Sequence, residues 1–589
     1  MSRRPLVAVL CALAFAPAAL AATPTAPVYD FKGRLIQTPF APVQPARHLT
    51  KQHALRLFLA DRKVNDWLAR YPTKDRLDEA NYQPDQHSWE IKIWWGKAGE
   101  IATGRVDDAT GQVLEAWTGP QVAWKMARGY HGAFGGEKIN DPWIWGAFSL
   151  AFLVGLADFR RPLSWRNLDL VALLSFSVSL WYFNKGRVFT SVPLAYPPLV
   201  YLTGRGLWVG LRGRGTPGRP LWPAWILLAA TVFLVGFRIG LNVEASNVID
   251  VGYSGVIGAD RIAHGQSPYG HFPIEGDLKA CGPKDAAGEI RDRIQTNGRC
   301  ESANPQGDTY GPVAYEAYLP GYWIRGWSGK WDDLPAAHLT SLLWDGVCLV
   351  GLFFVGRRFG GIDLAAALPF AWAAYPFTQY ASNSNTNDMI LPAFLIWGFW
   401  LVSSHFWRGA FGALAGWTKF GALVVAPLWL TYPDRRPKIG FVLGFAAATL
   451  AAFSILLLEP NPLHAARVFW DRTFGWQLGR ASPFSLWDWR QYHARGLPDL
   501  HRVQQALEAL VLAGAAAFAF FPRRKSPLQL AALTAVLLLG FELVLTHWFY
   551  LYIPWFFAFS ALTTLAPPPV REPEPVVEPE LPALAPTAH

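Results

Sequence analysis

The sequence is poor in cysteine, and it contains neither a compact group of metal-ligating residues nor a convincing internal repeat. Of the four cysteines in 589 residues, Cys11 lies in the first apolar segment and Cys348 lies inside a later apolar run. Cys281 and Cys300 remain, together in one polar loop. A disulfide between them is expected if that loop is extracytoplasmic, and the alternative is an unpaired, reduced pair. Because no compact ligand motif is present, we expect no divalent metal and no other cofactor to be required.

Acidic residues are also fewer than basic ones, 43 against 53, which gives a formal net charge of +10. Such an excess is typical of nucleic-acid-binding proteins. Here, however, the basic residues lie in short loops between apolar runs, where they orient membrane helices. No nucleic-acid partner is therefore expected. The loops contain Arg160-Arg161, Arg212 to Arg214, Arg357-Arg358, Arg435-Arg436 and Arg523-Arg524-Lys525.

Apolar runs of about 18 to 22 residues recur from Ile144 onward, which is the pattern of bilayer-spanning helices. The fold class expected is a polytopic α-helical membrane protein with about 12 transmembrane segments and a small α+β extracytoplasmic N-terminal domain. One pair of segments is re-entrant, because Lys419 interrupts the apolar stretch from Gly409 to Tyr432, whose flanks are both basic. Candidate spans lie at roughly 143–157, 168–184, 190–210, 222–243, 338–355, 362–377, 388–404, 409–432 (the re-entrant pair), 437–458, 503–521, 527–546 and 548–566.

The N-terminal region precedes the first expected span. Residues 1–22 have the charged, apolar and small-residue regions of a secretory signal peptide. Residues 23–142 are polar, and Trp89 to Trp95 and Ile101 to Glu115 predict strands joined by a tight turn at Asp107-Asp108-Ala-Thr-Gly111. This turn resembles that of PepSY-like domains, which implies a substrate- or partner-binding module. The alternative is a cap that only packs on the membrane domain.

A chain that begins outside and crosses the membrane at each expected span has all its basic loops in the cytoplasm. Two long loops, residues 244–337 and 459–501, then lie outside. Residues 143–221 form accessory membrane helices, and residues 567–589, rich in proline and glutamate, form a disordered cytoplasmic tail.

Ionisable residues gather near the outer ends of the expected spans. Because charges inside a bilayer are costly, such a cluster indicates a polar cavity that opens to the outer face. Each member also has a structural alternative: a basic side chain can extend to the interface, and an aspartate such as Asp345 can form a structural ion pair. The residues are Arg238, Asp250, Asp345, Asp388, Lys419, Glu542 and His547.

Six short motifs follow one another within residues 222–566. The first, at the start of the long outer loop, is Asp250-Val-Gly-Tyr253 with Gly265-Gln-Ser-Pro268-Tyr269. The others are Tyr310-Gly-Pro312, Asn385-Thr-Asn387-Asp388, Trp417-Thr-Lys419, Gln477-Leu-Gly-Arg480-Ala-Ser-Pro-Phe-Ser-Leu-Trp487 and His547-Trp-Phe-Tyr550-Leu-Tyr552-Ile-Pro554-Trp555. In this order they resemble the GT87 branch (DUF2029-like) of the GT-C glycosyltransferases.

The resemblance implies a catalytic membrane domain over residues 222–566. Its reaction would be inverting transfer of a sugar, mannose or another hexose or pentose, from a polyprenyl-phosphate donor. The acceptor would be a cell-envelope glycan or glycolipid on the outer face of a bacterial inner membrane. Asp250 would be the general base that takes the proton of the acceptor hydroxyl.

The remaining site residues are expected to bind substrate. Lys419, Arg480 and Arg238, in that order, are candidates to stabilise the departing phosphate. Asp250 could instead cap a following helix, and His547, an acceptor or phosphate ligand, could instead belong to an interfacial aromatic belt. Asn387 and Asp388 could hold sugar hydroxyls or cap the next span. Asp345 and Tyr253 complete the expected substrate-binding set.

Two other functions compete with an enzyme. A polytopic transporter or lipid flippase would have similar spans, but it would more often contain inverted repeats with interrupted helices. A membrane-anchored sensor would use the N-terminal domain, but it leaves the charges near the outer face unexplained. Two outer loops rich in Trp, Tyr and Gly favour a sugar-binding enzyme.

Overall fold

The computed structural model of this chain divides it into two compact units, Met1–Val122 and Ala123–His589. The expected signal peptide, residues 1–22, and the expected tail, residues 567–589, lie outside the described residues. The structure describes residues 28–29, 32–37, 47–119, 121–122, 125, 132–213, 215, 222–274, 278–283, 290, 292–493 and 498–566.

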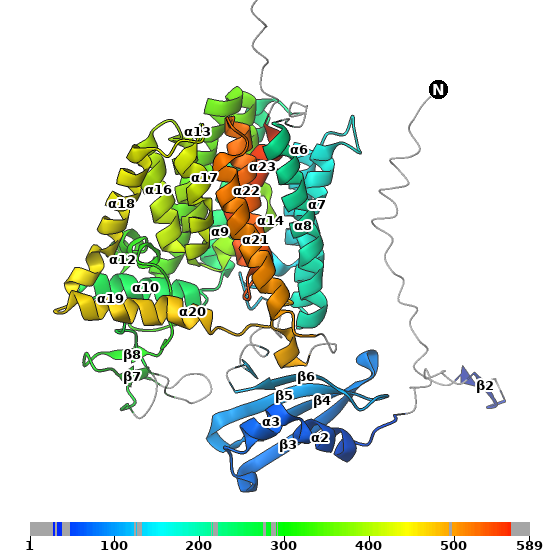
Figure 1. Cartoon of the computed structure of the whole chain (residues 1–589). Coiled ribbons are helices and arrows are strands. Elements are labelled where there is room, and N and C mark those ends of the chain that lie inside the picture. The colour runs from blue at the N-terminus through cyan, green and yellow to red at the C-terminus, as the bar shows by residue number, and fades with distance from the viewer. Residues whose placement is uncertain are drawn as a thin grey trace, which may run out of the picture. The chain divides into compact units, whose positions relative to one another are not determined.

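The first unit is built on a four-stranded antiparallel sheet in which strands adjacent in sequence pair in the order β3-β4-β5-β6. Helices α2 and α3 cover one face of the sheet (Figure 1). Phe58 of α2 lies so close to Gly104 that a Cβ at that position would collide with its ring. The elements are α2 (Lys51–Ala60), α3 (Arg62–Leu68), β3 (Arg76–Gln83), β4 (Ser88–Trp95), β5 (Gly99–Asp107) and β6 (Val113–Thr118), with a separate hairpin of β1 (Val28–Tyr29) and β2 (Leu35–Gln37).

The strands and the tight turn expected between Trp89 and Glu115 are confirmed. Asp107 closes the turn by accepting hydrogen bonds from the Ala109 and Thr110 amides, and Gly111 has a φ of 70°. The buried carboxylate of Asp108 ties the turn to the rest of the unit, because it accepts hydrogen bonds from the His48 amide at 2.8 Å and the Trp89 ring nitrogen at 2.8 Å.

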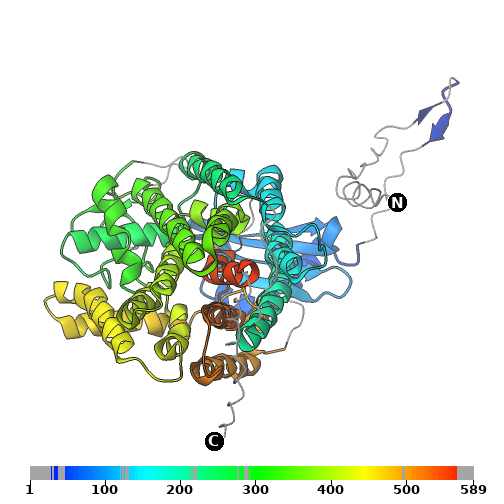
Figure 2. The same cartoon turned by 90° about the horizontal axis from the view of Figure 1, so that it is seen from above.

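The second unit is mostly helical, and its long helices run side by side (Figure 1). Viewed along the bundle, α23 lies among the other helices (Figure 2), and all its residues are buried. The helices of the bundle are α5 (Glu137–Asn140), α6 (Pro142–Leu156), α7 (Trp165–Phe183), α8 (Val188–Arg212), α9 (Ala224–Ala245), α13 (Pro335–Ala374), α14 (Pro376–Asn383), α15 (Ile390–Trp400), α16 (His405–Thr418), α17 (Ala426–Thr431), α18 (Ile439–Phe453), α21 (His501–Phe520), α22 (Pro527–Val544) and α23 (Ile553–Leu565).

The first unit ends at Val122, earlier than the boundary expected at residue 142. Helix α5 lies before that expected boundary but packs against α6 and α9 of the bundle. Asn140 of α5 is buried and accepts a hydrogen bond from Asn184 at 2.7 Å. These contacts assign the described residues from 132 onward to the helical unit.

The protein is a multi-pass membrane protein. Among the described residues, five helices are long and apolar enough to cross a membrane, namely α9, α13, α18 with its extension to Leu458, α21 and α22. About twelve segments were expected, and the others coincide with helices that are shorter or more polar. Helix α6 has 15 residues, and α8 contains three prolines.

Helix α13 is two helices joined at Gly361, whose φ of 70° and ψ of −159° are not helical. Asp345 accepts a hydrogen bond from the ring nitrogen of Trp372 at 2.7 Å. Residues this far apart in one straight helix would be about 40 Å apart, so the two halves fold back on each other. This hairpin corresponds to the two spans expected at 338–355 and 362–377.

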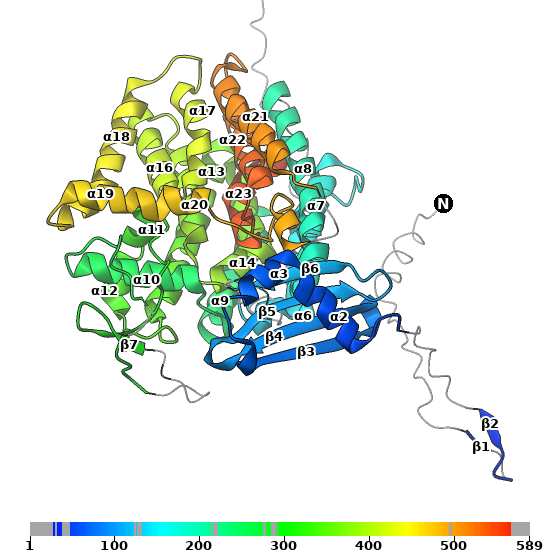
Figure 3. The same cartoon turned by 60° about the horizontal axis from the view of Figure 1, so that its bottom comes forward.

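Basic loops gather at one end of the bundle. The Lys525 amide donates to the Pro433 carbonyl at 2.9 Å, Arg358 donates to Ser403 at 2.6 Å, and Gln529 donates to the Gly210 carbonyl at 2.9 Å. Short helices lie across the opposite end (Figures 1 and 3). They are α10 (Asp250–Ala263), α11 (Val313–Glu316), α12 (Leu319–Arg325), α19 (Pro462–Trp470) and α20 (Trp476–Leu478).

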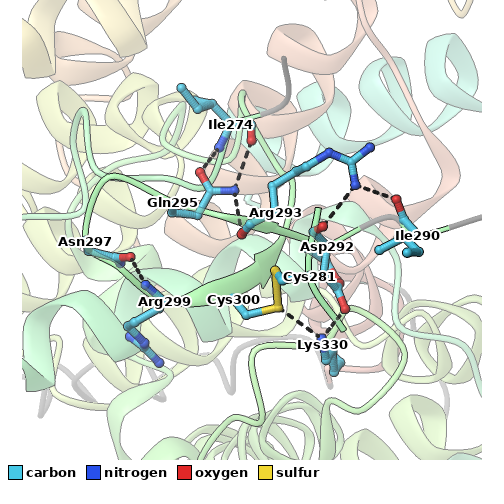
Figure 4. The surroundings of a disulfide bond; sticks show 11 residues. Ile274, Cys281, Ile290, Asp292, Arg293, Gln295, Asn297, Arg299, Cys300 and Lys330 are labelled. Carbon is cyan, nitrogen blue, oxygen red and sulfur yellow. Dashed lines mark hydrogen bonds and ion pairs between the residues drawn. A yellow bond between two sulfur atoms is a disulfide. The ribbon is translucent and has the colours of Figure 1, made fainter. Parts of the chain in front are cut away.

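A disulfide joins Cys281 to Cys300, the two cysteines expected to pair (Figure 4). Cys300 begins β8 (Cys300–Ser302), which pairs with β7 (Asp292–Ile294) in a short hairpin of the first long loop. Lys330 forms an ion pair with Asp292 beside the disulfide. The remaining cysteine in the described part of the chain, Cys348, is buried and free.

Candidate active-site cavity

Lys419 lies where the re-entrant segment turns back, between α16 and the 3-10 helix η5 (Phe420–Val425). The residue is extended, with φ −141° and ψ 123°, which ends α16. Its ammonium group donates to Asp388 Oδ1 at 2.8 Å. Both side chains are buried.

Asp388 is held by more than Lys419. The ring nitrogen of Trp555 donates to Oδ1 at 3.1 Å, and the Thr386 hydroxyl donates to Oδ2 at 2.7 Å. Three donors therefore fix a carboxylate that is 0% exposed. Because these donors occupy both oxygens, Asp388 positions Lys419 and has little capacity left to hold sugar hydroxyls.

The turn before Asp388 is attached to the segment that leads into α10. Asn385, with φ of 52°, donates to the Asn247 carbonyl at 3.0 Å and to the Ser246 hydroxyl at 2.9 Å. Gly252 of α10 packs so tightly on the Asn385 carbonyl that a side chain there would collide with it. These contacts fix the N-terminus of α10, and hence Asp250, relative to the Lys419–Asp388 pair.

A cavity of about 670 Å³ opens beside this ion pair. Its polar end carries Lys419, Arg480 and His547 among aromatic rings. The Lys419 ammonium lies 5.1 Å from the ring centre of Tyr552, which stacks on Trp555 with 4.4 Å between centroids. The polar and aromatic lining residues are Thr309, Tyr310, Thr418, Lys419, Phe420, Phe474, Gln477, Arg480, Glu508, Phe541, Thr546, His547, Tyr552 and Trp555.

Arg480 differs from Lys419 in having no compensating anion. Within the described residues, its guanidinium forms no ion pair or hydrogen bond, and its Nε is buried without a partner. The group stacks over the Trp476 ring at 4.9 Å. His547, at the same end, shares a hydrogen bond of 2.9 Å with the Ser482 hydroxyl. The polar end therefore carries one neutralised cation and one uncompensated cation.

An apolar groove extends from this polar end along α21. Its α21 wall combines positions 508, 512 and 516 with positions 511 and 515, the spacing of one helical face. Leu512 is 67% exposed although it lines the cavity, so the groove is open to the outer surface of the bundle. The eight residue steps from position 508 to position 516 give it a length of about 12 Å. Facing residues are Leu423, Val424, Pro427, Phe541, Val544 and Leu545.

Asp250 lies just outside the cavity. It is exposed at the first position of α10, and its side chain does not cap that helix, so the capping alternative is not observed. Tyr310 links it to the cavity: burial, followed by the negative charge of Asp250, raises the pKa of Tyr310, and Tyr310 also lies 5.2 Å from the Lys419 ammonium. Asp250 is therefore close enough to Tyr310, at the polar end of the cavity, for its charge to act on that side chain.

Five of the expected substrate ligands do not line the cavity: Asp388, described above, and four others. Arg238 and Asp345 pair with each other at 2.7 Å, the structural ion pair given above as the alternative. Thr378 and the Ala373 carbonyl take the remaining donors of the guanidinium. Tyr253 is buried and donates to the Ser302 carbonyl at 2.7 Å, and Asn387 is buried.

Some cavity residues were not among the sequence-predicted ligands. Tyr310, Tyr552 and Trp555 occur in the quoted motifs, but aromatic residues at an expected membrane interface gave no separate signal. Glu508 is exposed on α21 and lines the groove. The sequence could have indicated Glu508, because it is a single carboxylate within an apolar span, the same criterion that selected the other ionisable residues.

No family model matches the chain, and no curated protein matches its sequence. The resemblances to GT87 and to PepSY-like domains therefore gain no support from these comparisons. The chain is similar to the crystal structure of ArnT from Cupriavidus metallidurans bound to undecaprenyl phosphate, with a TM-score of 0.35 and 15% sequence identity. The match covers 58% of this chain and 59% of that one, so it spans less than two thirds of the length of ArnT.

Proposed function

We propose that this protein is a membrane glycosyltransferase of the GT-C type that takes a sugar from a polyprenyl-phosphate carrier. The cavity carries the proposal, because it joins a cationic, aromatic end to an apolar groove that opens toward the lipid-facing surface of α21. A polyprenyl-phosphate sugar has the same two parts in the same order. Its phosphate would meet Arg480 and Lys419, and its first prenyl units would lie along the groove.

The charges of the polar end suit a phosphodiester. Lys419 is already paired with Asp388, so Arg480 supplies the uncompensated positive charge that a singly charged phosphate needs. The aromatic rings of Tyr310, Tyr552 and Trp555 surround the ammonium group and exclude water, which strengthens its interaction with an anion. Sugar rings commonly pack on such aromatic faces, and the same rings would hold the donor sugar.

In the proposed reaction, an acceptor hydroxyl attacks the anomeric carbon while its proton passes to Asp250. The bond between that carbon and the phosphate oxygen breaks, and the phosphate leaves with the electron pair. Attack opposite the leaving group inverts the anomeric centre. Asp250 suits the role of base because it is exposed, its carboxylate makes no hydrogen bond or ion pair within the described chain, and its position on α10 is fixed.

The sugar is proposed to be mannose or another hexose or pentose, and the acceptor a glycan or glycolipid of the cell envelope. The site would face outward from a bacterial inner membrane. The test is transfer from a panel of radiolabelled polyprenyl-phosphate sugars to a crude envelope fraction by the purified protein. Asp250→Asn is compared with Asp332→Asn, a change at an exposed aspartate elsewhere in the same outer loop.

We expect transfer from one donor, unchanged in Asp332→Asn and lost in Asp250→Asn. Transfer that survives in Asp250→Asn would retain the enzyme and reject this base. No transfer from any donor by a folded, lipid-binding protein would reject the enzyme and favour a lipid flippase, since the same cavity could then carry the lipid across.

A further inference from the structure

A helical segment of 17 residues crosses the end of the bundle that carries the cavity (Figures 1 and 3). It comprises α19, the π-helix η7 (Asp471–Gly475) and α20, without a break. One face, carrying Ala465, Phe469 and Thr473 at intervals of four, is buried. Phe469 makes edge contacts with Tyr269 at 4.9 Å and Phe453 at 5.1 Å. The segment is therefore docked on the outer loops along one face.

The opposite face of this segment is apolar and exposed. Leu463 is 85% exposed, Trp470 is 57% exposed and Leu478 is 87% exposed. Leu463 and Trp470 are seven residues apart, which is about two turns of an α-helix and keeps both on one face. Trp470 and Leu478 are eight residues apart, one more than two α-helical turns. A π-helix holds one more residue per turn than an α-helix, so η7 keeps Leu478 in the stripe begun by Leu463 and Trp470.

The segment is held in this orientation from its buried side. Arg472, within η7, donates through Nε to both oxygens of Asp308, at 2.7 and 2.8 Å. Asp308 also accepts the Gly270 amide at 2.8 Å, so the clamp reaches back to the first outer loop. Because the buried face is fixed, the apolar stripe cannot rotate inward to be covered by this chain.

We infer that α19, η7 and α20 lie on the outer leaflet of the membrane, with Leu463, Trp470 and Leu478 inserted among the lipids. Continuity with the exposed apolar side of a candidate membrane span identifies the occupant. Helix α18 and its extension form one of the candidate spans, and their exposed apolar residues Leu450 and Leu457 lead directly to Leu463.

The composition of the exposed face also fits a membrane surface. Arg467 lies between Leu463 and Trp470 and is exposed, and a tryptophan with a basic neighbour is typical of the headgroup region. A second copy of the chain would more often bury a broad apolar patch than a narrow stripe interrupted by a cation.

This position has a consequence for the cavity. Leu478 lines the cavity, as does Arg480 two residues later. A leaflet-bound segment therefore holds the mouth of the cavity at the level of the lipid phosphates. A lipid phosphate would reach Arg480 by lateral movement within the leaflet and would not have to leave the bilayer.

The test uses nitroxide labels on single cysteines introduced at 463, 470 and 478 of the full chain in lipid nanodiscs. Leu510→Cys, on the lipid-facing side of α21, is the bilayer reference, and Lys74→Cys, exposed on the first unit, is the water reference. The unsubstituted chain, whose free Cys348 is buried, is the labelling blank. Accessibility to oxygen is compared with accessibility to a water-soluble nickel chelate.

We expect labels at 463, 470 and 478 to have the high oxygen and low nickel accessibility of the label at 510. Labels that behave like the one at 74 would overturn the inference, because the stripe would then face water. Labels that neither reagent reaches would also overturn it, because a second copy or another protein would then cover the stripe. The readout requires no sugar transfer, so it is independent of the proposed function.

Discussion

Replacing Arg480 should weaken lipid-phosphate binding without weakening the fold. The guanidinium lines the cavity and has no anionic partner in the described structure. Its removal therefore leaves no charge behind and relieves repulsion with Lys419. A hydrogen bond between charged groups contributes about 1.5 to 3 kcal/mol, so Arg480→Gln should raise the Kd for a polyprenyl phosphate by about 10- to 100-fold.

Lys419 provides the matched contrast, because its charge is paired. Lys419→Met leaves the Asp388 carboxylate buried with its cation gone, which should cost about 3 to 5 kcal/mol of stability. Adding Asp388→Asn removes the orphaned charge and should restore most of that stability, but not lipid binding. Arg480→Gln, by comparison, should unfold at the same temperature as the natural protein or slightly higher.

The assay is thermal unfolding in detergent, with and without a short-chain polyprenyl phosphate. A ligand that binds only the folded protein raises the Tm by an amount that grows with the logarithm of its affinity at a fixed ligand concentration, so stability and binding come from one experiment. Arg480→Lys is the conservative control and should retain part of the shift. An unchanged ligand-induced shift in Arg480→Gln would refute this account of the cavity, as would an Arg480→Gln protein as unstable as Lys419→Met.

Three further outcomes are expected. Leu512→Trp should fill the groove and raise the KM for long-chain donors, whereas Leu510→Trp, two residues away and outside the cavity lining, should leave it unchanged; equal effects would exclude the groove as the prenyl site. Burial alone would raise the pKa of Asp108, but hydrogen bonds from His48, Trp89 and Leu49 outweigh it and hold the pKa at about 2, against a usual 3.8. The ionised carboxylate therefore contributes about 2 kcal/mol to the free energy of unfolding, and this contribution is present above pH 4 and lost as the pH falls toward 2. Asp108→Ala should abolish this acid dependence of unfolding. Replacing Cys281 and Cys300 by serine should lower the free energy of unfolding by about 3 kcal/mol, because the bridge closes a loop of 19 residues. A double serine variant with the same Tm as the natural protein, both measured without reductant, would contradict this.

The course of the chain was largely predictable from its apolar runs and basic loops. Lys419 interrupts an apolar stretch whose two flanks are basic, which predicted a break at this residue, and α16 ends there. The break at Gly361 was likewise expected, because Arg357 and Arg358 divide two apolar runs. Hydropathy is a local property, and these features depend on nothing distant in the sequence.

Pairing between distant residues was not predictable in the same way. Arg238, Asp345, Asp388 and Lys419 all lie near one end of their segments, and sequence alone could not assign partners. The structure separates them into two pairs, because the hairpin at Gly361 brings Trp372 and Asp345 to Arg238. The shift of the exposed stripe by one residue at η7 was equally hidden, since a π-turn has no distinct sequence pattern.

The division of charge between Arg480 and Lys419 matches the demand of the proposed reaction. A phosphodiester carries one negative charge, and the phosphate that leaves as a monoester acquires a second. Arg480, unpaired in the described structure, can bind the first charge at once. Lys419 is held by Asp388 and gains most from an anion only as the second charge develops, and an interaction that strengthens toward the transition state accelerates the reaction. A ground-state role for Arg480 and a transition-state role for Lys419 thus follow from one difference, the presence or absence of a carboxylate partner.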